Sequence, residues 1–202
     1  MGCELSKLAT PKAQNQTTTE PNATTEANPT TDPRLPLTAK QKYTVMASWK
    51  AISRELVATG VFMLMRLFEE HEELIQMFSR FLDSKSKEEC GQQFDMVELK
   101  KHAEKVMAAL DESIKGLDDM DVFLTCLHQV GATHTKIPGF NGQYFWKIEQ
   151  PFLQAVQQTL QDRYSENVES IYKITIKFII ETLIEGFNKA QNNKAQSTAA
   201  NS

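Results

Sequence analysis

Apolar residues recur at helical spacing through most of the chain, and no stretch of any length shows the alternation that marks a strand. Leu64, Leu67 and Phe68, for example, are three and four residues apart and therefore share one helix face. This pattern predicts an all-α domain whose helices are too unequal in length for a simple bundle. We expect helices at about 38–52, 54–70, 74–77, 95–115, 120–135, 141–161 and 166–187.

Several helix ends can be predicted from single residues. Thr38 and Gln41 have the spacing of a capping box, in which each side chain accepts from a backbone N–H near the start of a helix. The sequence Ile137-Pro138-Gly139 should end one helix, and Ser165 should cap the last. Pro151 lies inside the 141–161 segment and should kink it or replace one turn, because proline cannot donate the usual hydrogen bond.

The two ends of the chain differ from its middle in composition. The first 36 residues hold eight threonines and five of the seven prolines, and apolar residues are sparse between Thr10 and Arg34. Such a segment cannot bury enough apolar surface to offset the entropy lost on ordering. We therefore divide the chain into a disordered tether at 1–36, a folded domain at 37–188 and a disordered polar tail at 189–202.

Charge and hydropathy exclude several classes of protein. The formal net charge of −4 comes without a basic patch, so we do not expect nucleic acid to be a partner. No apolar run approaches the roughly 20 residues that span a bilayer as a helix. The N-terminus also lacks the charged and then apolar pattern of a secretory signal, so we expect the domain to stay in the cytosol.

The first six residues, Met1 to Ser6, match the pattern for N-terminal acylation. Removal of Met1 exposes Gly2 as the acceptor for myristate, and the adjacent Cys3 is then a site for palmitate. Two acyl chains hold a protein on a membrane, whereas one binds only weakly. We predict a lipid anchor at Gly2 and Cys3 on the cytoplasmic face of a cellular membrane such as the plasma membrane. The alternative is an ordinary N-terminus in which these residues occur by chance.

Two histidines carry the strongest chemical signal. His102 and His134 are 32 residues apart, and each lies in a stretch with helical apolar spacing. Histidines brought together from two helices can ligate one metal from opposite sides, as haem iron is held in its fifth and sometimes its sixth position. His128 lies six residues before His134, roughly 240° around the helix, so the two cannot face one iron. Either ligand candidate could instead be an ordinary core or surface histidine.

Other residues occur in a characteristic order around these histidines. They are Trp49, Gly60, the run Phe78-Ser79-Arg80-Phe81, the run Lys101-His102-Ala103, and His134 with Tyr144-Phe145 ten and eleven residues later. In this order they resemble the globin family, over about three quarters of the chain. With its N-terminal Met1-Gly2-Cys3 and long tail, the chain most resembles globin X, the membrane-anchored branch of that family.

The resemblance implies a globin fold around a pocket for haem b. It makes His134 the proximal iron ligand and His102 the distal residue, which in globin X is itself the sixth ligand. The other ring N–H of His134 then needs an acceptor, for which the Val130 carbonyl and the Thr133 hydroxyl are candidates.

The resemblance also assigns roles to residues around the pocket. Its dry walls are expected to include Leu64, Phe78, Val106 and Phe140. Arg80 and Lys105 are expected to pair with the haem propionates. The plainer alternatives are that the apolar residues belong to an ordinary core and that Arg80 and Lys105 are solvated surface charges.

Three functions are compatible with such a protein. The first is a membrane-tethered, bis-histidyl globin that binds O2, CO or NO reversibly and acts in electron transfer, lipid protection or signalling with an unidentified redox partner. The second is an oxygen carrier or store. The third is a haem enzyme, such as a nitrite reductase or a protein with peroxidase-like activity. A haem-free scaffold with the same fold is a fourth alternative. Dual acylation favours the first, since an abundant store would gain nothing from an anchor.

Overall fold

The computed structural model describes the backbone of residues 31–81 and 94–200, and the side chains of residues 31–78 and 94–197. Within these ranges the chain is helical and contains no strand, as predicted. The α-helices are α1 (Ala39–Ile52), α2 (Leu56–Glu70), α3 (Met96–Lys115), α4 (Met120–Thr133), α5 (Glu149–Leu160) and α6 (Glu166–Ala200). Shorter 3₁₀ segments are η1 (Glu72–Phe81), η2 (Gly116–Asp118), η3 (His134–Lys136), η4 (Gly142–Ile148) and η5 (Gln161–Arg163).

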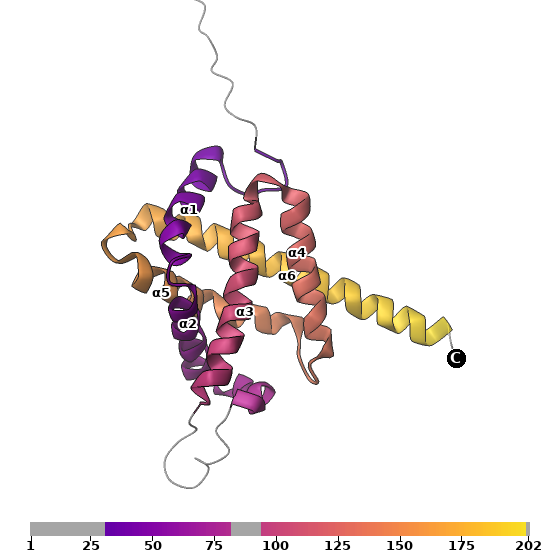
Figure 1. Ribbon diagram of the computed structural model, residues 1–202. Helices are drawn as coiled ribbons and strands as arrows, with labels where there is room; N and C mark the ends of the chain where they lie inside the picture. The colour runs from indigo at the N-terminus through magenta and orange to yellow at the C-terminus, as the bar shows by residue number, and fades with distance from the viewer. Residues whose placement is uncertain (1–30, 82–93, 201–202) are drawn as a thin grey trace, which may run out of the picture.

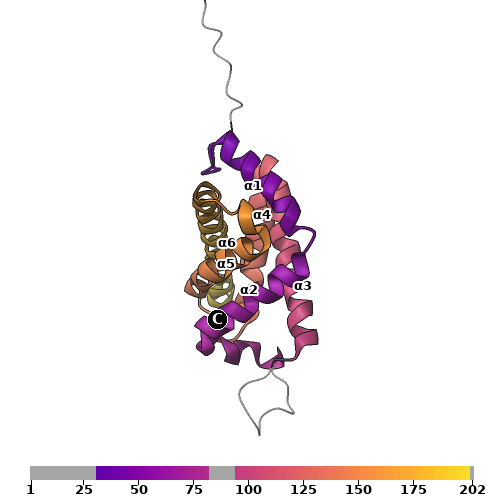
Figure 2. The same ribbon diagram turned by 90° about the vertical axis from the view of Figure 1, so that its left-hand side faces the viewer.

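Helices α3 and α4 run side by side in opposite directions, joined through η2, and α6 crosses behind both of them (Figure 1). The turned view shows α5 and α6 on one side of the molecule and α3 on the other (Figure 2). The most extensive helix pairings are α4 with α6 and α2 with α3. The two histidine-bearing helices are therefore each packed against a different partner.

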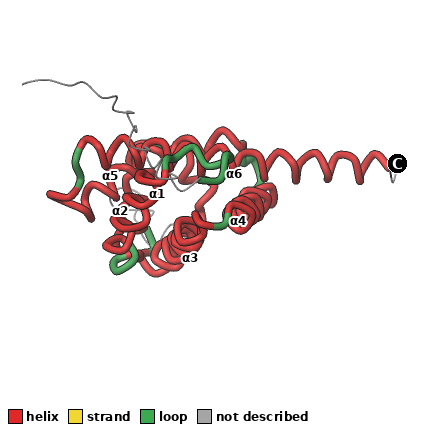
Figure 3. The backbone as a smooth tube through the Cα atoms, turned by 90° about the horizontal axis from the view of Figure 1, so that it is seen from above, coloured by secondary structure: helices red, strands yellow, loops and turns green. Residues whose placement is uncertain are grey.

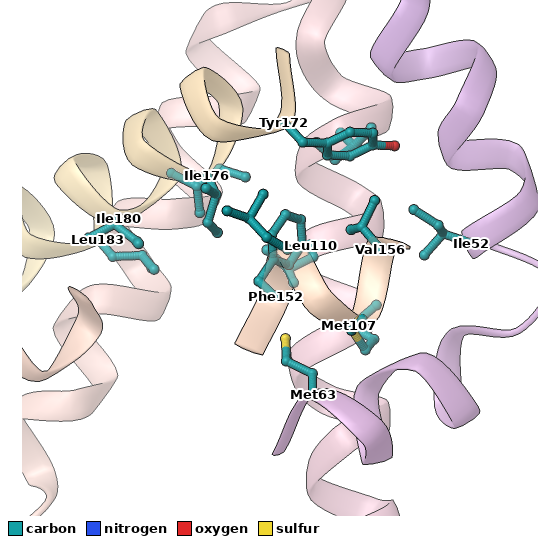
Figure 4. Packing of buried hydrophobic residues seen from close by; sticks show 14 of the residues in the cluster. Ile52, Met63, Met107, Leu110, Phe152, Val156, Tyr172, Ile176, Ile180 and Leu183 are labelled. Carbon is teal, nitrogen blue, oxygen red and sulfur yellow. The ribbon is translucent and has the colours of Figure 1, made fainter. Parts of the chain in front are cut away.

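The core is formed by large apolar side chains from all six α-helices. Ile176, Ile180 and Leu183 follow one another along α6, and Phe152 approaches them from α5 (Figure 4). Met107 of α3 is fully buried in the same core. Burying such side chains contributes about 1.5–3 kcal/mol each relative to leaving them in water, so this core holds the helices in place.

Two helix crossings bring backbones unusually close together. A Cβ on Gly131 of α4 would lie 2.1 Å from the carbonyl oxygen of Leu183, and one on Gly186 of α6 would lie 2.4 Å from the carbonyl oxygen of His128. At the other crossing, a Cβ on Gly60 of α2 would lie 2.5 Å from a side-chain carbon of α3. These glycines allow α4 to meet α6, and α2 to meet α3, at distances that a side chain would prevent.

Residues just before the predicted boundary at residue 37 also contact the helical domain. Leu35 and Leu37 are both buried in the core. Arg34 donates to Asp121 of α4 at 2.7 Å and to Asp32 at 2.8 Å. These contacts fix the residues before α1 against the start of α4. The capping box predicted at the start of α1 is confirmed by both of its hydrogen bonds.

The last helix is longer than predicted. We expected it to end near Phe187, but α6 continues to Ala200 and projects beyond the other helices (Figure 3). The sequence after Gly186 contains no glycine or proline, and its alanine, glutamine and lysine residues favour helix. The prediction that this helix ends near Phe187 was therefore wrong, because it used only the polarity of the following residues.

The predicted helix at 141–161 is interrupted, but before Pro151 rather than at it. The chain forms the 3₁₀ segment η4 up to Ile148, and α5 then begins at Glu149. This puts Pro151 in the first turn of α5, where a backbone N–H would have no partner within the helix. Among the described residues, no helix is both long enough and apolar enough to span a bilayer.

Candidate functional site

An apolar cavity of about 370 Å³ lies between the helices that carry the two histidines. This volume falls within the range of about 300–1,000 Å³ that is typical of small-molecule and cofactor sites. Both His102 of α3 and His134 at the end of α4 line it. Its other walls come from α2, α5, α6, η1 and η4. The fold thus brings both predicted ligand candidates to one cavity.

His134 is held in a defined orientation. It is the first residue of η3, directly after α4, and its Nδ1 lies 2.9 Å from the carbonyl oxygen of Val130. A carbonyl can only accept, so Nδ1 must carry a proton, and in the neutral ring Nε2 then has the free lone pair. Of the two acceptors predicted for this ring, the Val130 carbonyl is the one used. The Thr133 hydroxyl instead donates to that same carbonyl at 2.6 Å.

The surroundings of His134 favour its neutral form. Burial lowers the pKa of His134, and the hydrogen bond to Val130 opposes that shift only in part. Aromatic rings pack around the imidazole, with Phe140 at 5.0 Å and Phe145 at 4.7 Å between ring centroids. A neutral imidazole with one nitrogen hydrogen-bonded to a carbonyl is the form in which histidine ligates metals.

His102 enters the cavity from α3. Its ring meets Phe78 of η1 edge to face, with ring centroids 5.4 Å apart. Phe78 in turn packs against Phe68 of α2 at 4.9 Å. The ring of His102 therefore adjoins an aromatic cluster that links α3 to η1 and α2.

The structure places five of the predicted pocket residues beside the cavity. Leu64, Phe78, Val106 and Phe140 all line the cavity, and so does the exposed Lys105. The side chain of Arg80 lies outside the described residues, as do Gly2 and Cys3. Every predicted wall residue whose side chain the structure describes therefore lines the cavity.

Other lining residues were not identified from the sequence. They include Phe152 of α5 and a stripe on α6 formed by Ile176, Ile179, Ile180 and Leu183. Their helical spacing was visible in the sequence, but an apolar stripe looks the same whether it faces a neighbouring helix or a cavity. No local signal could have separated these two cases.

The residues around the cavity fit a haem group better than a bare metal ion. Among the described residues, no Cys, Asp or Glu lines the cavity, and no group of three or more metal-binding side chains occurs. Two imidazoles alone cannot complete the coordination of an ion, since protein metal sites usually supply three or more ligands. A metal whose other ligands belong to an apolar macrocycle needs only these two histidines and apolar walls.

The two remaining histidines take part in surface contacts. His128 lies 3.2 Å from a carboxylate oxygen of Glu185 across the crossing of α4 and α6. His71 lies near Glu73 and near Lys147 of η4. Neither is among the residues that line the cavity, in agreement with the sequence analysis.

Comparison with known proteins gives consistent results. Residues 61–183 match the family model described as Globin. Neuroglobin from Dissostichus mawsoni is 26% identical over 159 residues, which cover 79% of this chain and 98% of that protein. Cytoglobin-1 from Oryzias latipes is 32% identical over 99 residues, or 49% of this chain and 54% of that protein.

A solved structure is similar over almost its whole length. It is the crystal structure, at pH 4, of a hexacoordinated haem protein from an anhydrobiotic tardigrade. Its sequence is 37% identical, the TM-score is 0.70, and the match covers 78% of this chain and 99% of that one.

Proposed function

The chain belongs to the globin family as a haem-binding globin related to the neuroglobins and cytoglobins, and we propose that His134 and His102 are the two residues that would hold the haem iron. One observation carries this proposal: the two imidazoles come from different helices to a single apolar cavity. The similarity to a hexacoordinated haem protein supports the same ligation. We take the bound group to be haem b, because the chain has no Cys-x-x-Cys-His motif for covalent attachment.

Each residue around the cavity then has a separate task. His134 is the permanent ligand through Nε2, and the Val130 carbonyl keeps its ring in one orientation. The walls, which include Leu64, Val106 and Phe140, exclude water. Lys105 at the exposed edge offers a positive charge to a propionate. Haem supplies an iron atom that binds diatomic gases and changes between two oxidation states.

We propose that His102 is the exchangeable ligand. If His102 also held the iron, O2, CO or NO would compete with its imidazole for the same site. A protein with both axial positions filled by histidine is suited to exchanging electrons, and with a lipid anchor also to lipid protection or redox signalling at a membrane. This six-coordinate resting state separates the proposed function from an oxygen store, whose sixth position is open.

Absorption spectra of the purified, haem-loaded protein test this proposal. We expect a low-spin, six-coordinate ferrous spectrum without gas, followed by conversion to a CO form when CO is added. A ferrous spectrum that is five-coordinate from the start would instead support an oxygen carrier or store. Reduction of added nitrite to NO at a substantial rate would support the enzymatic alternative.

We also propose that the N-terminal segment anchors the protein to the cytoplasmic face of a membrane through myristate on Gly2 and palmitate on Cys3. The sequence Met1-Gly2-Cys3 supports this, together with the long segment that precedes the folded domain. One myristoyl chain binds membranes only with a constant of roughly 10⁴ M⁻¹, so the second chain is needed for stable attachment.

Cell fractionation of full-length, C-terminally tagged protein tests the anchor. Gly2→Ala should be wholly cytosolic because it blocks the first modification and thereby the second. Cys3→Ser should be partly released, and neither variant should have an altered haem spectrum. Retention of Gly2→Ala in the membrane fraction would show that the proposed acylation does not hold the protein there.

A further inference from the structure

The part of α6 beyond the predicted end of the domain contacts the segment that carries His134. Lys194 lies in this part of the helix, and its Nζ donates to the backbone oxygen of Thr135 at 3.2 Å and to the Thr135 hydroxyl at 3.1 Å. Thr135 directly follows His134 in η3. A residue from the end of the chain thus reaches the neighbour of the proposed permanent ligand.

The position of Lys194 matches the electrostatics of a helix end. Helix α4 ends at Thr133, and the last carbonyls of a helix carry partial negative charge and lack partners within it. The Thr135 hydroxyl already donates to one of these carbonyls, that of Ala132, at 2.8 Å. Lys194 therefore adds a positive charge and two hydrogen bonds at the C-terminal end of α4. Both bonds go to Thr135 in η3, so Lys194 acts on the segment that directly follows α4.

Helix α6 supports the surroundings of His134 at a second place. The Phe187 ring lies 5.7 Å from that of Phe140 and 6.4 Å from that of Phe145, and both of these rings contact His134. A Cβ on Gly142 would lie only 3.0 Å from the Phe187 ring, so η4 passes very close to α6 here. Between Phe187 and Lys194, α6 therefore contacts the two phenylalanines that pack against His134 and also Thr135, the residue that follows His134.

We propose that Lys194 is a positioning residue for His134: by holding Thr135, it fixes η3 and with it the direction of the imidazole. The proposal rests on the proposed function, in which His134 ligates haem iron. Under this proposal, the part of α6 after Phe187 helps to position a haem ligand, a role that its polar composition does not suggest.

The test compares three variants of the full-length, haem-loaded protein. Lys194→Met removes the charge and both hydrogen bonds to Thr135, Lys194→Arg retains a cationic donor, and Lys189→Met removes an equal charge from the same helix. Lys189 is a matched control because it pairs with Glu185 at 2.7 Å. We expect Lys194→Met to lose haem to a scavenging apoprotein about two- to fivefold faster than wild type, the range for a charge at an exposed helix end. Lys194→Arg should largely restore the wild-type rate.

A second measurement separates positioning from general stabilisation. In a His102→Leu background His134 is the only protein ligand, so the iron–histidine stretching band in the ferrous resonance Raman spectrum reports on its orientation. Lys194→Met should shift or broaden this band, while Lys194→Arg and Lys189→Met should leave it unchanged.

Two results would overturn the proposal in distinguishable ways. A haem-loaded wild type whose Lys194→Met and Lys189→Met variants behave alike in both measurements would overturn the role of Lys194 alone. A wild-type protein that binds no haem, or whose iron is not ligated by His134, would overturn the proposed function and this role together.

Discussion

The two walls that carry the histidines are built differently. On the His134 side, a backbone carbonyl fixes the ring, two phenylalanines pack against it, and α4 and α6 meet backbone to backbone at Gly131 and Gly186. On the His102 side, the ring adjoins Phe78 of η1, a 3₁₀ segment whose helical geometry is interrupted at Phe78 itself (φ −106°, ψ 28°). One wall is therefore more tightly constrained than the other.

This difference suits a protein with one permanent and one exchangeable ligand. A ligand that must stay is helped by a backbone acceptor, because a main-chain carbonyl cannot rotate away from the ring as a side-chain acceptor can. A ligand that must leave requires neighbours that can adjust. We infer that the His134 wall holds the iron in place and that the His102 wall controls access to it, and four substitutions test this division.

The largest effect is expected from His134→Ala. If His134 is the permanent ligand, the change removes the bond between chain and iron and leaves a large apolar cavity that must collapse or take in water. We expect the variant to lose stoichiometric haem or to release it readily, measured from the Soret absorbance relative to protein after purification. Haem content and a ligation spectrum identical to those of wild type would contradict the assignment of His134.

The next effect concerns the close crossing behind His134. Gly→Ala within a helix normally stabilises it, but a Cβ on Gly186 would collide with the backbone of His128. We expect Gly186→Ala to lower the free energy of unfolding by about 1–3 kcal/mol or more, as overpacking does. Urea titration of the haem-loaded protein measures this change.

Gly116→Ala is the matched control for that experiment. A Cβ there would have Val122 at 3.7 Å, an ordinary contact, and Gly116 has a negative φ of −81°. This substitution should be neutral or slightly stabilising. If both alanine variants have the same stability, α4 and α6 can move apart, and the His134 wall is not the rigid one.

A kinetic effect is expected from His102→Leu. Removing the exchangeable ligand should convert ferrous protein to a five-coordinate form and accelerate CO binding by about tenfold or more, because the open state is otherwise a minor population. Flash photolysis or stopped-flow mixing measures the rate. An unchanged rate would mean that His102 does not occupy the iron in the ferrous protein and would remove the functional difference between the walls.

The smallest effect is expected from Lys105→Met. If Lys105 pairs with a propionate at the exposed edge, its loss should speed haem release by about two- to fivefold, the range for exposed ion pairs. The exposed Lys100 lies on the same helix but does not line the cavity, so Lys100→Met is the control. Equal release rates for the two variants would show that Lys105 contributes only surface charge.

Much of the site could be predicted because its signals are local. The period of apolar residues located the helices, and Thr38 with Gln41 marked the start of α1 to the residue. The Val130 carbonyl was a predicted acceptor for His134 because an acceptor one turn back is a property of any helix. The resemblance to globins supplied the rest, since spacing alone does not tell a ligand histidine from a core histidine.

The residues that were missed depend on contacts between distant parts of the chain. Lys194 and Thr135 are 59 residues apart, and Arg34 and Asp121 are 87 residues apart. Lys194 lies in a polar segment that composition assigned to a disordered tail. Composition reports how much apolar surface a segment can bury, and it says nothing of whether a neighbouring helix end offers carbonyls to a lysine.

Residue types and their spacing along the chain predicted most of the helical elements and the side chains that have the chemistry of ligands, because both are local properties. Tertiary structure decided which apolar faces enclose a cavity and which merely pack, as on α6, where Ile176 and Leu183 line the pocket. It also decided that α4 and α6 touch at Gly131 and Gly186. These features follow from the relative placement of whole helices, which is set by the packing of every face at once.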